Sequence, residues 1–333
     1  MNIHSSLSGF GYSIPPETLS NSEIEATTSV TDEWIVSRTG IRARHILSGE
    51  MTGTGLALDA AEKALRRSGH TAEQITHILY CTCTPDAACP SAACTLAGKL
   101  DRIGCMALDL NAACAGFVYG LELADALLAR TPEACVLLVA SEALSHRCNY
   151  SDPSTAVLFG DGAGAVIATR PDAGSGSALR GSLVDVKLGS DGSKRELLLI
   201  SGGFSASPYK LGDTVGPDYF IRMQGGAVFK HAVRYMSEYC LELLARNGLA
   251  ASDIDVFIPH QANLRIIDAV GSRLGIDPDK VFLNVQKYGN TSAASIPIAL
   301  GEAVETGFIK PGMRVLVTSF GGGLTIGAGL IQF

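Results

Sequence analysis

Four short segments of the sequence carry residue types that can perform acyl transfer, and the first is segment 109–117 (DLNAACAGF). A predicted strand ends here, small residues crowd a turn, and a predicted helix begins near Cys114. A cysteine at a helix N-terminus faces the positive end of the helix dipole and unpaired backbone N–H groups, which favour the thiolate. The sharp strand-to-helix turn is the same device as the nucleophile elbow of other α/β enzymes. The pattern fits a nucleophile, and it fits a cysteine that merely packs in the core about as well.

The other three segments supply a histidine, an asparagine and a run of glycines. His260 follows a predicted strand, at the carboxyl edge where α/β sheets build active sites. Asn290 follows Gly289 in a turn and could donate a neutral hydrogen bond to an oxyanion, while Gly322 could offer a backbone N–H. Alone, each has a plainer explanation as a structural histidine, a turn former or a flexible turn. Together with Cys114 they supply a nucleophile, a base, a neutral donor and a backbone oxyanion site.

The elements that must position these residues alternate along the chain. We expect strands at 75–81, 105–110, 134–140, 254–259, 281–284, 314–319 and 328–332, and helices at 54–68, 91–100, 115–130, 226–248, 262–274 and 295–306. Such alternation predicts an α/β fold with largely parallel sheets. The order of elements in the second half repeats that of the first. We therefore predict two related halves, 1–172 with the cysteine and 173–333 with the histidine and asparagine, joined within the Gly- and Ser-rich stretch 171–182.

Composition narrows the functional class. The 333 residues are 47% hydrophobic and 18% charged with a net charge of −7, which argues against a nucleic-acid binder. The N-terminus has no basic region followed by an apolar run, and no apolar run approaches the roughly 20 residues that span a bilayer. The nine cysteines are odd in number and match no zinc or disulfide spacing. We expect a soluble cytoplasmic protein with reduced thiols and no metal.

At these segments the sequence resembles β-ketoacyl-[acyl-carrier-protein] synthase III, a family of the thiolase-like superfamily. The resemblance runs from about residue 31 to 333 and rests on DEWIVSRTGIRARHI (32–46), AACAGF (112–117), FGDGAGAV (159–166), PHQANLRII (259–267), GNTSAAS (289–295) and FGGG (320–323). It implies a five-layer αβαβα sandwich of two βαβαβ-type halves, usually in a homodimer.

The same resemblance implies a mechanism. Cys114 would take the acyl group from acyl-CoA. His260 and Asn290 would donate hydrogen bonds to the thioester oxygen of malonyl acyl-carrier protein while it loses carbon dioxide. The backbone N–H groups of Cys114 and Gly322 would hold the oxyanion, and neither a metal nor another cofactor is required.

Four further residues are assigned to substrate binding by the resemblance. Trp34 would stack on the CoA adenine, Arg38 would contact its phosphates, and Asn263 would lie beside them. Cys89 stands where many relatives have a phenylalanine that reaches across the dimer into the acyl pocket. This smaller residue predicts acceptance of primers longer or more branched than acetyl. The arginine that many relatives carry shortly after Cys148, where it sandwiches the adenine, is absent, since 150–153 reads YSDP.

Basic residues near the tunnel mouth would meet the acidic carrier protein. The resemblance implies Lys230 and Arg265 for this contact. Arg234 lies four residues after Lys230 and can share its helix face, although a solvated helix face is the slightly favoured explanation for it.

Three other functions explain part of the pattern. A relative of the same fold could prime polyketides, make β-keto signals or transfer acyl groups without condensation. Retention of both His260 and Asn290 favours condensation, because simple transfer needs no decarboxylation site. A cysteine hydrolase would use the same three residue types, but that function leaves the segments GNTSAAS and FGGG unexplained. A catalytically silent acyl-binding protein would not need the set of Cys114, His260 and Asn290.

Overall fold

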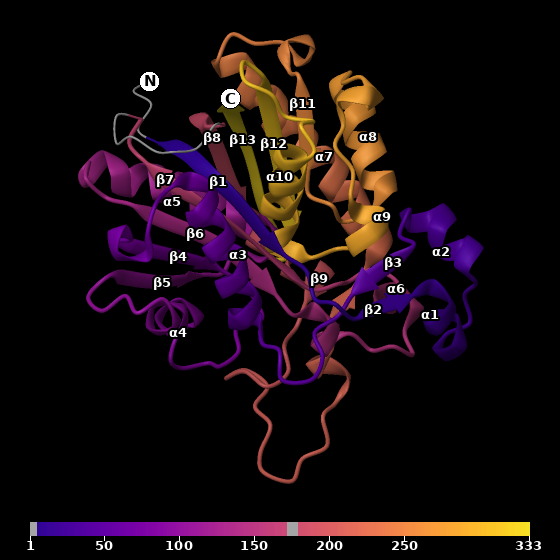
Figure 1. Ribbon diagram of the computed structural model, residues 1–333. Coiled ribbons are helices and arrows are strands. Elements are labelled where there is room, and N and C mark those ends of the chain that lie inside the picture. Colours follow the sequence, from indigo (N-terminus) through magenta and orange to yellow (C-terminus); the bar gives the residue numbers. More distant parts are fainter. Residues whose placement is uncertain (1–4, 172–178) are drawn as a thin grey trace.

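The computed structural model describes residues 5–171 and 179–333, and a mixed sheet forms the frame of this part of the chain (Figure 1). Its strands lie in the order β11-β12-β13-β8-β1-β7-β6-β4-β5. Their bounds are β1 Ser6–Ser13, β4 His77–Cys81, β5 Met106–Leu110, β6 Val136–Glu142, β7 Gly162–Thr169, β8 Gly181–Ser190, β11 Val256–Pro259, β12 Arg314–Gly321 and β13 Thr325–Gln332. The pairs β4–β5, β4–β6 and β11–β12 are parallel and the others antiparallel. The prediction of largely parallel sheets is therefore wrong, because the first and last strands of each half run against their neighbours.

The two halves of the sheet have the same internal order. Outward from the centre, the first half runs β1, β7, β6, β4, β5, and the second runs β8, β13, β12, β11. A parallel bridge from Phe257 to Val281 stands in the fifth place of the second half. The strand predicted at 281–284 is thus reduced to a single bridge. The repeated order confirms the predicted pair of related halves, while the boundary between residues 172 and 173 lies outside the described residues.

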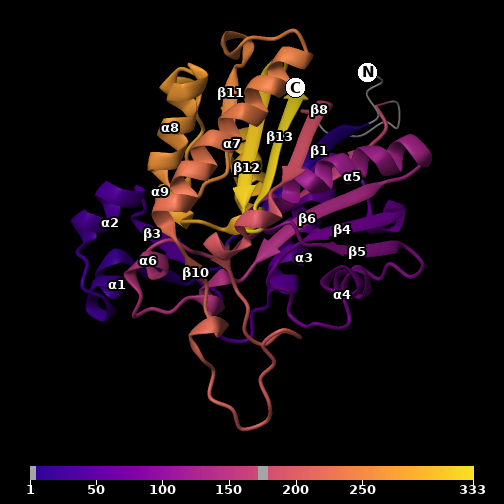
Figure 2. The ribbon, with the colours of Figure 1, turned by 180° about the vertical axis from the view of Figure 1, so that it is seen from behind.

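Helices complete five layers, as Figures 1 and 2 show from opposite sides. The main helices are α3 Gly53–Ser68, α4 Ala92–Lys99, α5 Gly116–Arg130, α7 Gly225–Arg246, α8 Leu264–Leu274 and α10 Ser295–Glu305. The half-sheets join where β1 and β8 pair through two residue pairs only, and α5 and α10 contact strands of both halves. The outer face of the first half is covered by α3 and α4, and that of the second by α7 and α8.

The middle layer holds the largest core. Phe117 and Leu121 of α5 pack with Ile298 of α10 and with strand residues of both halves, such as Leu138 and Val317. All five side chains are almost fully buried, and each contributes roughly 1.5–3 kcal/mol of hydrophobic free energy. This burial anchors the N-terminal ends of α5 and α10, where the functional turns lie.

Smaller elements close one end of the molecule. They are β2 Thr18–Ser20, α1 Asn21–Thr27, α2 Asp32–Thr39, β3 Ala43–His45, α6 Pro153–Ala156, β9 Leu198–Leu199, β10 Arg222–Met223 and α9 Val285–Tyr288. None of the helices among the described residues is both long and apolar enough to cross a membrane.

Candidate active site

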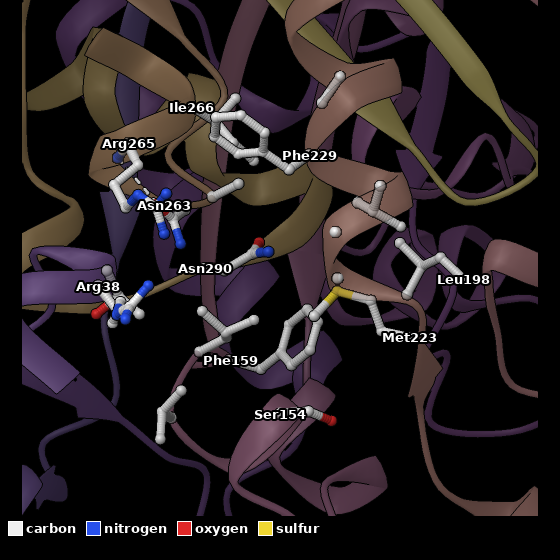
Figure 3. Close-up of a pocket in the computed structure, with 18 of the residues that line it drawn as sticks. Arg38, Ser154, Phe159, Leu198, Met223, Phe229, Asn263, Arg265, Ile266 and Asn290 are labelled. Carbon is white, nitrogen blue, oxygen red and sulfur yellow. Dashed lines mark hydrogen bonds between the residues drawn. The ribbon is translucent and has the colours of Figure 1, made fainter. Parts of the chain in front are cut away.

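Two cavities meet at Cys114. The first, of about 370 Å³, runs from Trp34 and Arg38 inward to Cys114, His260 and Asn290. Figure 3 shows Asn290 in its middle, between a polar side with Arg38, Asn263 and Arg265 and an apolar side with Leu198 and Met223. The second cavity has about 260 Å³ and is mostly apolar. Its lining includes Leu144, Phe159, Leu198, Leu199, Ile200 and Ile221 together with Cys83, Arg147, Ser292 and Gly322. The structure thus brings the three predicted catalytic residues to one place.

The turn before α5 presents Cys114. A 3-10 turn, Ala113–Ala115, joins β5 to the helix, and Ala113 has φ 46°, which costs a non-glycine residue roughly 1–2 kcal/mol. Cys114 is buried, and this burial raises the pKa of its thiol to about 12, although a hydrogen bond from Ser292 acts in the opposite direction. Burial therefore opposes the thiolate that a position at a helix N-terminus favours.

His260 follows the last residue of β11 and is buried. Burial lowers the pKa of its imidazole to about 3, so the ring is neutral at physiological pH. Its Nδ1 lies 2.6 Å from Ser295 Oγ, at the start of α10. When that hydroxyl donates to Nδ1, the remaining proton is on Nε2, and a neutral histidine then offers a hydrogen-bond donor to the cavity.

Asn290 is held by the backbone around it. Its Oδ1 accepts a hydrogen bond of 2.9 Å from the N–H of Ser292, which leaves the amide NH₂ to donate into the cavity. The preceding Gly289 has φ 65°, and a Cβ there would lie 2.6 Å from the carbonyl oxygen of Leu158. Glycine is therefore required for the turn to approach this neighbouring segment so closely.

The glycine run at the end of β12 lies against the turn that carries Cys114. A Cβ on Gly321 would stand 2.6 Å from the backbone nitrogen of Cys114. Ser319 Oγ donates to the carbonyl of Cys114 (2.7 Å), and Thr325 Oγ1 donates to the carbonyl of Ala112 (2.7 Å). Gly322 lines the second cavity beside Cys114. These contacts fix the backbone where an oxyanion would form.

Most of the predicted substrate residues line the outer part of the first cavity. Trp34 is 40% exposed, and the Arg38 guanidinium lies 5.9 Å from its ring centroid. Asn263 caps α8, and Arg265 stacks on Phe229 at 5.5 Å. Pro153 and Ser154 also line this cavity, close to the stretch where the second arginine is absent.

Three predicted residues lie away from both cavities. Cys89 is exposed on the loop before α4, so its predicted role in a partner's acyl pocket stays a prediction. Lys230 and Arg234 are exposed on α7, and Arg234 Nε lies 3.0 Å from Glu238 Oε1. That ion pair fits the solvated-face explanation of Arg234.

Sequence reasoning missed Ser292, Ser295 and Glu142. The two serines lie in the GNTSAAS segment, but their spacing alone did not assign them to Cys114 and His260. Glu142 ends the buried strand β6. A charged residue next to such an apolar run is rarely buried without a partner, so its position in the sequence could have indicated a functional role. Among the described residues, no cluster of three or more His, Cys, Asp or Glu residues could hold a metal ion.

A buried cysteine beside a neutral histidine and an asparagine, on a duplicated five-layer sandwich, defines a thiolase-like condensing enzyme. Family models agree: residues 108–192 match 3-oxoacyl-[acyl-carrier-protein (ACP)] synthase III and residues 244–333 its C-terminal region. The β-ketoacyl-[acyl-carrier-protein] synthase III of Nitratidesulfovibrio vulgaris (strain DP4) is 56% identical over the full length of both chains. The crystal structure of the corresponding Aquifex aeolicus VF5 enzyme has a TM-score of 0.89 and 41% identity, covering 99% of this chain and 100% of that one. The chain belongs to the β-ketoacyl-[acyl-carrier-protein] synthase III family.

Proposed function

We propose that the chain initiates fatty acid synthesis by condensing an acyl group from acyl-CoA with malonyl acyl-carrier protein to give a β-ketoacyl product. The observation that carries this proposal is the position of Cys114 at the meeting point of two unlike cavities. The first leads inward from Trp34 and Arg38 to Cys114, the path that a phosphopantetheine arm would take, and the second is apolar enough to hold an acyl chain.

In the first half-reaction the sulfur of Cys114 attacks the thioester carbonyl of acyl-CoA. The tetrahedral oxyanion is stabilised by the backbone N–H groups of Cys114 and Gly322, which belong to segments in contact. Collapse of the intermediate releases the CoA thiol and leaves the acyl chain on Cys114. A covalent acyl-enzyme divides the reaction into two easier steps.

In the second half-reaction malonyl acyl-carrier protein enters the first cavity. Decarboxylation places negative charge on its thioester oxygen, and His260 and Asn290 stabilise that charge with two neutral donors. A neutral imidazole suits this role, since burial keeps the pKa of His260 at about 3. The carbanion then attacks the acyl-cysteine carbonyl and restores Cys114. The reaction needs no cofactor beyond the CoA of the substrate.

We further propose a homodimer formed through β5. This edge strand pairs with β4 alone among the described strands, and Met106 and Leu108 on it are 41% and 42% exposed. Ile103 beside it is 91% exposed. An apolar open edge favours pairing with a second copy, which would also bring the exposed Cys89 loop to the interface. We also propose a cytoplasmic location, in which the nine cysteines would stay reduced.

The carrier protein is proposed to dock at the mouth of the first cavity. Arg265 lines this mouth, and Lys230 lies on α7, which packs against α8. Both side chains are exposed and available to an acidic partner. Because the chain is acidic overall, at −7, such a local basic patch would orient the carrier protein.

The test is intact-protein mass spectrometry with a panel of acyl-CoAs of increasing length and branching, for the wild type and for Cys114→Ala. We expect an acyl mass on the wild type only, discharged by malonyl acyl-carrier protein as a β-ketoacyl thioester. His260→Ala and Asn290→Ala should still be acylated but should not discharge it. Discharge to water would favour a hydrolase, and discharge to a small nucleophile without loss of carbon dioxide would favour a simple acyltransferase. Either result would overturn the proposal.

A further inference from the structure

Cys114 is a buried thiol, yet acyl transfer needs its thiolate, so its proton must have a destination. Among the described residues, its Sγ makes a side-chain hydrogen bond to Ser292, with 3.4 Å between Sγ and Oγ. The same Oγ lies 2.9 Å from Oε1 of Glu142. His260 is not suited to accept the proton, because its Nδ1 is bound to Ser295 and its imidazole has a lowered proton affinity.

A serine hydroxyl has one proton and can donate it to only one of its two neighbours at a time. Ser292 Oγ lies within donating distance of both Cys114 Sγ and Glu142 Oε1. When its proton is donated to the Glu142 carboxylate, its contact with a Cys114 thiol can only be one in which the S–H donates to Oγ. If both protons move by one position, Glu142 becomes protonated and Ser292 donates to a thiolate instead. The observed contacts serve both arrangements without movement of a heavy atom.

Glu142 is built to serve as an acceptor. It is fully buried, and its Oε2 is fixed by hydrogen bonds from Thr82 Oγ1 (3.1 Å), Thr84 Oγ1 (2.6 Å) and the Cys83 N–H (3.1 Å). Its Oε1 receives the Ser292 hydroxyl at 2.9 Å, which is closer than the Cys83 N–H (3.3 Å) and the Cys83 Sγ (3.4 Å) that also contact this oxygen. Burial raises the pKa of this carboxyl above its usual range, which increases its affinity for a proton.

We propose that Ser292 and Glu142 form a relay that takes the proton from the thiol of Cys114 as the acyl thioester is attacked. Ser292 touches the reacting sulfur, and Glu142 acts through it as a positioning residue that stores the proton. The Cys114 S–H bond breaks, the sulfur forms a bond to the acyl carbon, and the bond to the CoA sulfur breaks. The proton then returns through Ser292 to the leaving thiolate, so the half-reaction is balanced. The acylation part rests on the proposed function.

The test is the pH dependence of Cys114 alkylation by iodoacetamide, followed by peptide mass spectrometry between about pH 6 and pH 8. Moving a proton from Cys114 to Glu142 leaves the number of bound protons unchanged, so the reactive fraction does not depend on pH in this range. The wild-type rate should therefore level off at a plateau. In Glu142→Gln and in Ser292→Ala the relay is broken. The alkylation rate of Cys114 should then fall about tenfold for each unit by which the pH is lowered.

The surrounding titratable groups do not mimic this plateau. Cys83 contacts Glu142, and Tyr80 and Cys81 lie near enough to interact with its charge. Burial raises the pKa of all three, so they stay neutral over this range. Alkylation of the exposed Cys89 and Cys94 is measured in every sample, and it shows how the reactivity of the reagent itself compares between samples.

Ser319→Ala is the matched control. It also removes a buried hydroxyl that contacts Cys114, but at the carbonyl oxygen, so it should keep the plateau. Thermal unfolding checks each variant, and if Glu142→Gln does not fold, Ser292→Ala decides by the same criterion. A wild-type rate without a plateau, or a plateau that survives both substitutions, would overturn the relay.

A second readout addresses the reaction itself. Single-turnover acylation by acyl-CoA should fall by about 10²-fold or more in both relay variants, the usual contribution of general base catalysis. Discharge of pre-acylated enzyme by malonyl acyl-carrier protein should change much less, because the thiol proton has already left. Equal losses in both steps would contradict the relay. Since alkylation needs no substrate, it tests the relay even if the condensation proposed above fails.

Discussion

Replacing His260 by glutamine should make the stability of the protein less sensitive to acid. Burial lowers the pKa of His260 from 6.5 to about 3 in the folded protein, while the unfolded chain keeps the ordinary value. Below about pH 6.5 the unfolded state therefore binds a proton that the folded state does not bind until about pH 3. Unfolding becomes progressively more favourable as the pH falls through this window, and above it the effect vanishes.

The magnitude follows from the same shift. One pKa unit corresponds to about 1.36 kcal/mol, so the full effect of His260 is on the order of 5 kcal/mol near pH 3. At pH 5, about one and a half units below the unfolded-state pKa, the loss is about 2 kcal/mol. The group is almost fully buried, so solvent screening reduces this figure little.

The assay is urea unfolding followed by far-ultraviolet circular dichroism at pH 8 and pH 5, at one protein concentration because a dimer is expected. Between the two conditions the wild type should lose about 2 kcal/mol more than His260→Gln. His146→Gln removes an exposed histidine and should lose stability as the wild type does. Equal pH dependence of the wild type and His260→Gln would refute the reasoning, because it would mean that the folded protein accepts the proton at an ordinary pH.

Three further predictions concern the site and its surface. Trp34→Ala should raise the KM for acyl-CoA about tenfold with little change in kcat, because the ring lies at the outer end of the first cavity. Initial rates measured against acyl-CoA concentration give both constants. Gly321→Ala should abolish acylation, seen as a missing acyl mass, because the new Cβ would lie 2.6 Å from the Cys114 nitrogen. Lys230→Ala should raise the KM for malonyl acyl-carrier protein several-fold in low salt, and Arg234→Ala should do so less, because Arg234 is paired with Glu238.

The elements visible in the sequence are those with a strong apolar pattern. Helix α3 was predicted at 54–68 and spans Gly53–Ser68, because its buried alanines and leucines recur at helical spacing. Strand β1 was missed, since its sequence SLSGFGYS contains two glycines that weaken any strand signal. Those glycines exist because α3 packs directly on the strand: a Cβ on Gly9 would lie 2.1 Å from the Ala64 carbonyl oxygen.

Residue types and the predicted ends of strands were sufficient to predict which residues form the site, but not their protonation states or the shape of the cavities. Cys114, His260 and Asn290 all lie at turns on one edge of the sheet, so their convergence follows from the order of elements. The protonation states did not follow, because they depend on burial and on Ser292 and Ser295, whose partners are far away in the sequence. The second cavity could not be predicted either, since Leu198–Leu199, which lines it, forms only a short strand within a stretch to which no element was assigned from the sequence.

The geometry of the site originates in the duplication. The segment 111–116 (NAACAG) and the segment 290–295 (NTSAAS) precede the two middle helices, α5 and α10, and each contains a 3-10 turn. In each, an asparagine Oδ1 accepts from the N–H two residues on, at 3.2 Å for Asn111 and 2.9 Å for Asn290. The donor residue has positive φ in both, 46° at Ala113 and 50° at Ser292.

One backbone device therefore occurs twice and carries different chemistry in each half. In the first half it presents a cysteine thiol one residue later, and in the second it presents the asparagine amide itself. The strands that end beside these turns also correspond, with Glu142 closing β6 and Gly321 closing β12. Gly321 lets the backbone approach Cys114, and Glu142 extends a carboxylate toward Ser292. Because the two turns contact each other across the middle layer, divergence of one repeated motif is sufficient to bring Cys114, Asn290 and Ser292, with the proposed proton acceptor Glu142, to one place.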